Sequence, residues 1–140
     1  MKFLLDSNVL FNIANDSAQG RVLLNRANAA GKNRCYVSVI SVFEARAAIK
    51  RRQVAPPNLA ALAGLLPSFR ALPFPENAAP FAASAVQSLR AAGFDPRKID
   101  LLDCLIAGHA MARGYTLVTD NERHFKPIQG LTWQNWRRPE

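Results

Sequence analysis

The chain has 140 residues, of which 49% are hydrophobic, so we expect one folded domain over residues 1–140 and exclude a disordered protein. No apolar run approaches the ~18 residues of a membrane-spanning helix, and Asp6 comes too early for a signal peptide. We therefore expect a cytoplasmic protein without a membrane segment. Cys35 and Cys104 form no CxxC pattern, which predicts buried free thiols.

Eighteen Lys and Arg against ten Asp and Glu give a net charge of +8, and Arg, which grips phosphate bidentately, dominates the basic residues. If several of the ten acids gather at one site, the rest of the surface is more basic still. A basic surface around an acidic site suits a polyanionic substrate. Charge alone fits a merely basic protein equally well.

Strand-like and helix-like segments alternate along the chain. Short apolar runs predict strands, and longer runs with helical periodicity, ended by Gly31, Gly93 and Gly114, predict helices. In chain order, the predicted strands cover residues 2–5, 36–39, 69–72, 115–119 and 131–136. The predicted helices cover residues 9–15, 17–30, 41–53, 58–66, 77–92 and 100–113.

This alternation predicts an α/β protein, a three-layer α/β/α sandwich with a mainly parallel central sheet. In such sheets, functional residues gather beyond the carboxyl ends of the strands. Asp6 follows the first predicted strand and Asp120 follows the strand at 115–119. Either residue alone would be a helix cap or a turn residue, but together they indicate one crevice.

Two further acids lie in predicted helices among apolar neighbours. Glu44 lies one turn into the helix at 41–53, where a buried carboxylate needs a partner, either Arg51 or a metal. Asp103 lies in the first turn of the helix at 100–113, whereas Asp100 fits the N-cap. Asp103 is therefore the better candidate for a site residue.

Four carboxylates around one crevice would repel each other, and a divalent cation would remove that conflict. Oxygen ligands suit Mg²⁺ or Mn²⁺, whereas zinc would favour His or Cys. Such an ion activates water and stabilises charge on a phosphoryl group during in-line displacement. The acids therefore indicate metal-dependent phosphodiester chemistry.

Four sequence pieces resemble one known family. They are Leu5-Asp6-Ser7-Asn8-Val9-Leu10, residues 38–44, residues 103–110 beginning Asp103-Cys104-Leu105, and Leu117-Val118-Thr119-Asp120-Asn121 followed by His124-Phe125. In order and spacing they are similar to the PIN-domain ribonucleases, and more narrowly to the VapC toxins of bacterial VapBC toxin–antitoxin pairs. The resemblance spans nearly the whole chain.

The resemblance implies a three-layer α/β/α fold and an endoribonuclease, a hydrolase that cleaves RNA with Mg²⁺ or Mn²⁺. It implies that Asp6, Glu44, Asp103 and Asp120 are the catalytic and metal-binding residues. It further implies an antitoxin protein as partner, a homodimer, and transfer RNA as a plausible substrate. Ser7 stands where the family usually has Thr or Ser.

Other residues receive supporting or structural roles. We expect Ser7, Asn8, Thr119 and Asn121 to support the site, and Lys50, Arg51 and Arg52, at the end of a helix that carries Glu44, to contact RNA. His109, ~120° around the helix from Asp103, is expected in the core or on the surface rather than as a ligand. His124 is expected to cap a loop, and Trp133 and Trp136 to pack.

The segment at 59–66 is apolar nearly all round, which predicts burial on more than one side and hence a partner surface or self-association. Other readings of the chain remain open. A haloacid-dehalogenase-like phosphatase would want Asp where Asn8 stands, a receiver domain would want an Asp in mid-chain, and an RNase H would begin with antiparallel strands. A regulatory, nucleic-acid-binding PIN domain that acts through a protein partner is the alternative from outside the enzymes.

Overall fold

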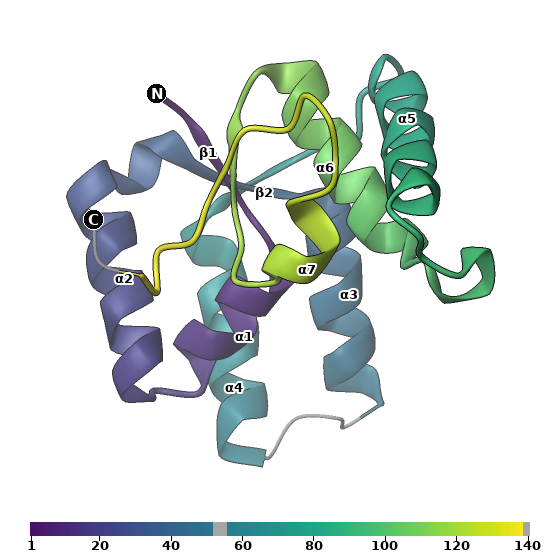
Figure 1. Ribbon diagram of the computed structural model, residues 1–140. Helices are drawn as coiled ribbons and strands as arrows, with labels where there is room; N and C mark the ends of the chain where they lie inside the picture. The colour runs from purple at the N-terminus through teal and green to yellow at the C-terminus, as the bar shows by residue number, and fades with distance from the viewer. Residues whose placement is uncertain (52–55, 139–140) are drawn as a thin grey trace.

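The computed structural model describes residues 1–51 and 56–138, which build a central sheet between helices (Figure 1). The five strands lie in the order β3-β2-β1-β4-β5, and every pairing is parallel, which confirms the predicted parallel sheet. The strands are β1 (Phe3–Leu5), β2 (Cys35–Ser38), β3 (Arg70–Leu72), β4 (Thr116–Val118) and β5 (Trp133–Gln134). The first strand, β1, is therefore central, with β2 and β3 on one side and β4 and β5 on the other.

Helices cover both faces of the sheet. Alternating side chains of β1 enter different cores: Phe3 and Leu5 join one cluster with α1, α2 and α4, and Leu4 joins another with α5, α6 and α7. The helices are α1 (Ser7–Ala14), α2 (Ala18–Ala30), α3 (Val39–Lys50), α4 (Pro56–Leu65), α5 (Ala78–Ala91), α6 (Leu101–Arg113) and α7 (Glu122–Phe125). Short 3₁₀ turns occupy Lys32–Arg34, Leu66–Ser68 and Pro96–Lys98. The three-layer architecture is thus confirmed.

Helices α1, α3 and α4 each begin two residues earlier than the apolar pattern predicts, and for α1 and α3 the reason is a polar residue directly after a strand that caps the helix. The Asp6 carboxylate accepts the Ser7 N–H, so α1 begins at Ser7. The Ser38 hydroxyl accepts the Ile40 N–H, so α3 begins at Val39. Caps of this kind fix a helix start independently of where the apolar face begins. Both corrections move the helices toward the carboxyl edge of the sheet.

Helix α6 packs closely against α5, and a glycine makes this approach possible. A Cβ atom on Gly108 would lie 2.6 Å from the backbone nitrogen of Ala82 and 2.8 Å from its Cα atom. Ala82 and Ala85 are buried on the facing side of α5. The small residues let the two backbones approach, which holds α6, and therefore Asp103 in its first turn, in a fixed position over the sheet.

Both cysteines, His109 and Trp136 are buried in the core. Both cysteines are buried free thiols, and no helix in the described parts of the chain is long and apolar enough to cross a membrane. His109 is fully buried, and its Nδ1 atom lies 2.8 Å from the hydroxyl of Ser38. Burial lowers the pKa of His109 to about 4, so the ring is neutral at physiological pH. Trp136 packs edge-on against Phe3, with ring centroids 5.1 Å apart.

Within this single chain the segment at 59–66 is buried on one side, and burial of its other side by a second chain remains a prediction. Leu62 and Leu66 enter the core, while Ala60, Ala61 and Gly64 face outward. Ala and Gly expose little apolar surface, so this helix can be apolar by composition and still have a solvated face. Leu59 and Leu65 are only half-buried, so apolar side chains of this segment remain accessible to a second chain.

Candidate active site

Asp6 lies at the carboxyl end of the central strand, where β2 and β4 flank β1 on its two sides. Its side chain is fully buried and its carboxylate accepts two hydrogen bonds, from the Ser7 N–H at 2.8 Å and from the Thr119 hydroxyl at 2.9 Å. Its own N–H donates to the carbonyl of Val118. Contacts from Ser7 in α1, from Val118 in β4 and from Thr119 directly after β4 thus fix this carboxylate at the edge of the sheet.

Glu44 projects from α3 toward the same place. The Ser7 hydroxyl donates to Oε1 of Glu44 at 3.2 Å and lies 3.5 Å from a carboxylate oxygen of Asp6. A hydroxyl has one proton, so Ser7 can donate fully to only one of the two carboxylates at a time. Ser7 therefore bridges Asp6 and Glu44 and couples their orientations.

Asp103 enters from the first turn of α6 and is 6% exposed. Its Oδ2 atom lies 2.8 Å from Nδ1 of His124 and accepts a longer bond of 3.4 Å from the Asn121 amide. The expectation that His124 caps a loop is therefore wrong. His124 lies in the short helix α7, which turns its ring onto Asp103.

The three carboxylates share one electrostatic environment. Burial raises the pKa of Asp6 from 3.8 to about 8, and the negative charges of Asp103 and Glu44 add to that rise. Burial also raises the pKa of Glu44 to about 7, with a further contribution from Asp103. The pKa of Asp103 is raised by burial and lowered in part by the hydrogen bond from His124. Each group thus resists ionisation while its neighbours are ionised.

A divalent cation fits the chemistry of these donors. Among the described residues, no Lys or Arg forms an ion pair with Asp6 or Glu44, so their charges have no cationic partner in that part of the chain. Carboxylate oxygens are the ligands that Mg²⁺ and Mn²⁺ prefer. The described His, Cys, Asp and Glu side chains nevertheless form no ready-made group of three or more around one point. The site therefore suits a divalent cation by the type of its ligand atoms and by its unbalanced negative charge, and not by a preformed arrangement of ligands.

Comparisons with known proteins agree with this geometry. A model of the PIN domain family matches residues 3–130. The chain belongs to the PIN domain family. The tRNA(fMet)-specific endonuclease VapC of Shigella flexneri is 29% identical over 137 residues, which cover 97% of this chain and 98% of that protein.

Two solved structures resemble this PIN domain over nearly its full length. The VapBC2 complex of Rickettsia felis, bound to a promoter DNA fragment, matches with a TM-score of 0.79 at 25% identity, covering 97% of this chain and 99% of that chain. The DNA-bound VapBC complex of Salmonella typhimurium matches with a TM-score of 0.76 at 29% identity, covering 97% and 98%.

Asp120, the fourth acid of the predicted site, points to other partners in this PIN domain. Its Oδ2 atom accepts hydrogen bonds of 2.9 Å from the Asn12 amide and of 2.9 Å from the guanidinium of Arg137. Asp120 is thus held between α1 and the C-terminal segment, while Asp6, Glu44 and Asp103 are brought together. Neither Asn12 nor Arg137 stood out in the sequence, because a pairing across 108 or 17 positions leaves no local pattern.

The predicted supporting residues fall in different places. Ser7 and Thr119 contact Asp6, and Asn121 contacts Asp103, as described above. Asn8 is exposed, and its side chain forms no hydrogen bond with the described residues. Lys50 and Arg51 are exposed at the end of α3, and Arg52 lies outside the described residues. The described structure does not contain the salt bridge between Glu44 and Arg51 that the sequence left open. Glu44 instead accepts a hydrogen bond from the Ser7 hydroxyl.

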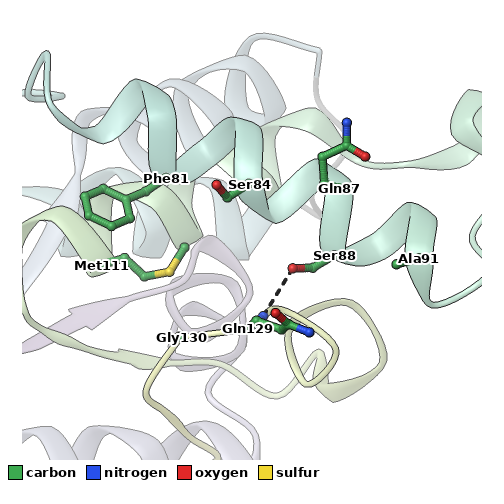
Figure 2. A pocket seen from close by; sticks show the side chains of 8 residues that line it. All are labelled: Phe81, Ser84, Gln87, Ser88, Ala91, Met111, Gln129 and Gly130. Carbon is green, nitrogen blue, oxygen red and sulfur yellow. Dashed lines mark hydrogen bonds between the residues drawn. The ribbon is translucent and has the colours of Figure 1, made fainter.

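A separate hollow of about 620 Å³ lies along α5, and its lining shows why it is not a candidate for this chemistry. Figure 2 shows Phe81 and Met111 at one end, and the Gln129 N–H donating to the hydroxyl of Ser88 at the other. None of the eight described lining residues carries a charge. The hollow contains no carboxylate to bind a metal and no cation to bind a phosphate.

Proposed function

We propose that this PIN domain is a Mg²⁺- or Mn²⁺-dependent endoribonuclease that hydrolyses RNA phosphodiester bonds and is the toxin of a toxin–antitoxin pair. The observation that carries the proposal is the buried group of Asp6, Glu44 and Asp103 at the carboxyl edge of the sheet. Buried carboxylates without a basic partner destabilise a fold, so their retention in one place indicates a function. The names of the relatives support transfer RNA as the substrate class.

The proposed mechanism assigns a role to each side chain. Asp6, Glu44 and Asp103 would hold the cation, which when bound stabilises charge on the phosphoryl group and makes a water molecule more acidic. Thr119 and Ser7 keep Asp6 oriented, and His124 does the same for Asp103. Ser7 occupies Oε1 of Glu44, so Oε2 is the atom that can orient the attacking water.

Asp120 would take part in this mechanism only after a change of its hydrogen-bond partners. It follows β4 at the same edge of the sheet, and we propose it as the fourth acid of the site. Its carboxylate is bonded to Asn12 and Arg137, so it would join the other three only by releasing Arg137. The side chain of Arg137 is 34% exposed and that of Asp120 is 12% exposed, so the exchange costs less than breaking a fully buried ion pair and more than breaking a surface one.

The direct test is cleavage of purified RNA. We expect the purified protein to cut transfer RNA at internal positions with Mg²⁺ or Mn²⁺ and to be inactive with a chelator. Mapping of new RNA 5′ ends after brief expression in cells would then identify the substrate and the cut position. Cleavage that persists in the chelator, or intact RNA under all metal conditions, would contradict the proposal.

Binding of RNA is expected to weaken steeply with salt, because basic side chains release counterions from phosphates. Lys50, Arg51 and Arg52 are our proposed contacts, since Lys50 ends α3, the helix that carries Glu44, and the two arginines follow it in the sequence. Replacing all three by Ala should lower the slope of log affinity against log salt by about 2. The control, which loses two charges instead of three, replaces exposed Arg34, which precedes β2, and exposed Arg70, the first residue of β3, at the opposite edge of the sheet. Equal slopes for both variants would exclude the α3 contacts.

An antitoxin protein is the partner that we propose, and exposed apolar residues beside the site support it. Phe43, adjacent to Glu44, is 57% exposed, and Leu101, two residues before Asp103, is 62% exposed. A protein that covers both would also cover the carboxylates. Co-purification with the product of an adjacent small reading frame, with loss of RNA cleavage in the complex, is the expected result. Full activity in such a complex would contradict inhibition by coverage.

Self-association as a homodimer is also proposed, although α4 gives it less support than its composition suggested. Val39 and Phe43, one turn apart on α3, are a better surface, because they are 42% and 57% exposed. Sedimentation of the purified protein would measure the mass directly, with Phe43→Ser as the variant that should shift a dimer toward monomer.

A further inference from the structure

A second pocket opens beside the carboxylates, on the other side of His124. It has a volume of about 470 Å³, and Phe94, Asp95, Lys98, Arg123 and His124 contribute to its lining. His124 also contacts Asp103 at 2.8 Å, so one side chain separates the pocket from the acidic site. The volume lies within the range of ~300–1,000 Å³ that small-ligand pockets occupy, which is enough for a nucleotide.

The pocket is cationic. Lys98 and Arg123 are exposed, and within the described residues neither forms an ion pair. The one carboxylate in the lining, Asp95, is paired with Arg97 at 3.3 Å and also accepts the Arg97 N–H. Its charge is therefore already balanced by a residue that is not assigned to the lining. Two cations are left to act on whatever enters the pocket.

The local structure positions the Arg123 guanidinium and the backbone that carries Lys98. The Arg123 guanidinium lies over the ring of Phe94, 5.1 Å from its centroid, and the His124 ring meets the same ring edge-on at 5.8 Å. Phe94 is positioned by the turn at the end of α5, where Gly93 has a φ of 95° and the Phe94 N–H donates to the carbonyl of Leu89. Lys98 ends the 3₁₀ turn Pro96–Lys98, whose proline restricts the backbone. Less entropy is lost on binding when the charges are positioned in advance.

We propose that this pocket binds the RNA nucleotide next to the scissile phosphate, with Lys98 and Arg123 on its phosphate and Phe94 positioning the Arg123 guanidinium. The proposal rests on the proposed ribonuclease function. It explains how a polyanion can stay beside a group of three carboxylates, which by themselves would repel it. A planar guanidinium held against an aromatic ring also offers a surface on which an RNA base stacks. An acidic peptide would use the charges but not this stacking surface.

The proposal predicts that loss of the two cations raises KM and leaves kcat nearly unchanged. In the Lys98→Ala/Arg123→Ala variant, KM for a single-stranded RNA of about ten nucleotides that spans the cleavage site should rise about tenfold, with kcat within about threefold of the original. The Arg34→Ala/Arg70→Ala variant loses the same charge at the opposite edge of the sheet and should retain the original KM. Equal KM values for the two variants would overturn the proposal.

Shortened substrates distinguish a direct contact from a general loss of fold or charge. When the RNA is shortened from the 5′ or the 3′ side of the cut, one of the two truncations should raise KM for the original protein and leave the double variant unchanged. Phe94→Leu should show the same pattern more weakly, because it frees the guanidinium without removing its charge. A penalty that persists in the double variant with both truncated RNAs would overturn the direct contact.

A binding measurement distinguishes failure of the proposed ribonuclease function from failure of the proposed pocket. If the protein cuts no RNA, the labelled ten-nucleotide RNA can still be titrated against it by fluorescence anisotropy at low salt. Weaker binding by the Lys98→Ala/Arg123→Ala variant than by the control would then support the pocket and contradict the nuclease. Equal binding by the two variants would overturn the pocket whether or not the protein cleaves RNA.

Discussion

RNA cleavage by the Asp6→Asn variant is expected to fall by about 10³-fold or more, because this substitution removes a buried negative charge from the proposed metal site. The fold should survive. The amide oxygen of Asn can accept the Ser7 N–H, as Asp6 does, and its NH₂ group can donate to the Thr119 hydroxyl. The free energy of unfolding should be equal or higher, since the uncharged side chain is buried without repulsion from Asp103 and Glu44.

The control for this prediction is Asp16→Asn. Asp16 is exposed, pairs only with Arg21 at the surface, and has a φ of 48°, a conformation that Asn tolerates well. Its cleavage rate should be unchanged. Asp103→Asn provides the second test, and it should lose cleavage as Asp6→Asn does. A folded Asp6→Asn or Asp103→Asn protein that cleaves RNA at the original rate would remove the carboxylates from the mechanism.

The sequence predicts the site best where an acidic residue stands at the end of an apolar strand or helix, because few purely structural roles account for a carboxylate there. Asp6 follows a buried strand, and Asp103 lies in the first turn of an apolar helix, and both positions follow from the pattern of strands and helices alone. The parallel sheet follows as well, because short apolar strands alternate with helices. The layer that each side chain of β1 enters does not follow from the sequence, because Phe3, Leu4 and Leu5 are all apolar; the structure places neighbouring residues in opposite cores.

The sequence was least informative where a side chain can choose between partners. Asp120 follows a strand just as Asp6 does, yet it is bonded to Arg137 and Asn12 instead of facing Asp103. The sequence predicts a loop at His124, because a helix of four residues has too little periodicity to be recognised. These contacts depend on how the C-terminal segment and α7 pack over the carboxyl edge of the sheet. No short pattern in the sequence encodes that packing.

The contrast between Asp6 and Asp120 also bears on how the site is built. Asp6 is fully buried and contacts only hydrogen-bond donors without charge, whereas Asp120 has the guanidinium of Arg137. Neutral donors orient a carboxylate without cancelling its charge, so the attraction for a cation remains. Asp6 is therefore preorganised to bind a metal ion, and the energetic cost appears as a pKa far above the ordinary value.

Without metal, the protein is expected to lose stability as the pH rises from 6.5 to 8. Burial raises the pKa of Asp6 from 3.8 to about 8 and that of Glu44 from 4.5 to about 7. In this range the unfolded chain has both groups ionised, while the folded protein still binds a proton at Asp6. The folded state therefore binds more protons, and its stability falls with pH by on the order of 2 kcal/mol from fully buried Asp6, while solvent screens the contribution of half-buried Glu44.

The pH window isolates the carboxylates from the other shifted groups. His109 has a pKa lowered to about 4 from 6.5, so it destabilises the fold only below pH 6.5, and the buried cysteines have pKa values raised to about 11. Urea unfolding in a chelator at the two pH values measures the effect, and Asp6→Asn should remove most of it. Saturating Mg²⁺ should restore stability at the higher pH, because the cation binds the ionised carboxylates and not the protonated ones. Equal stability at both pH values in the chelator would mean that Asp6 and Glu44 are already ionised in the folded protein, and that something other than a metal ion compensates their charges.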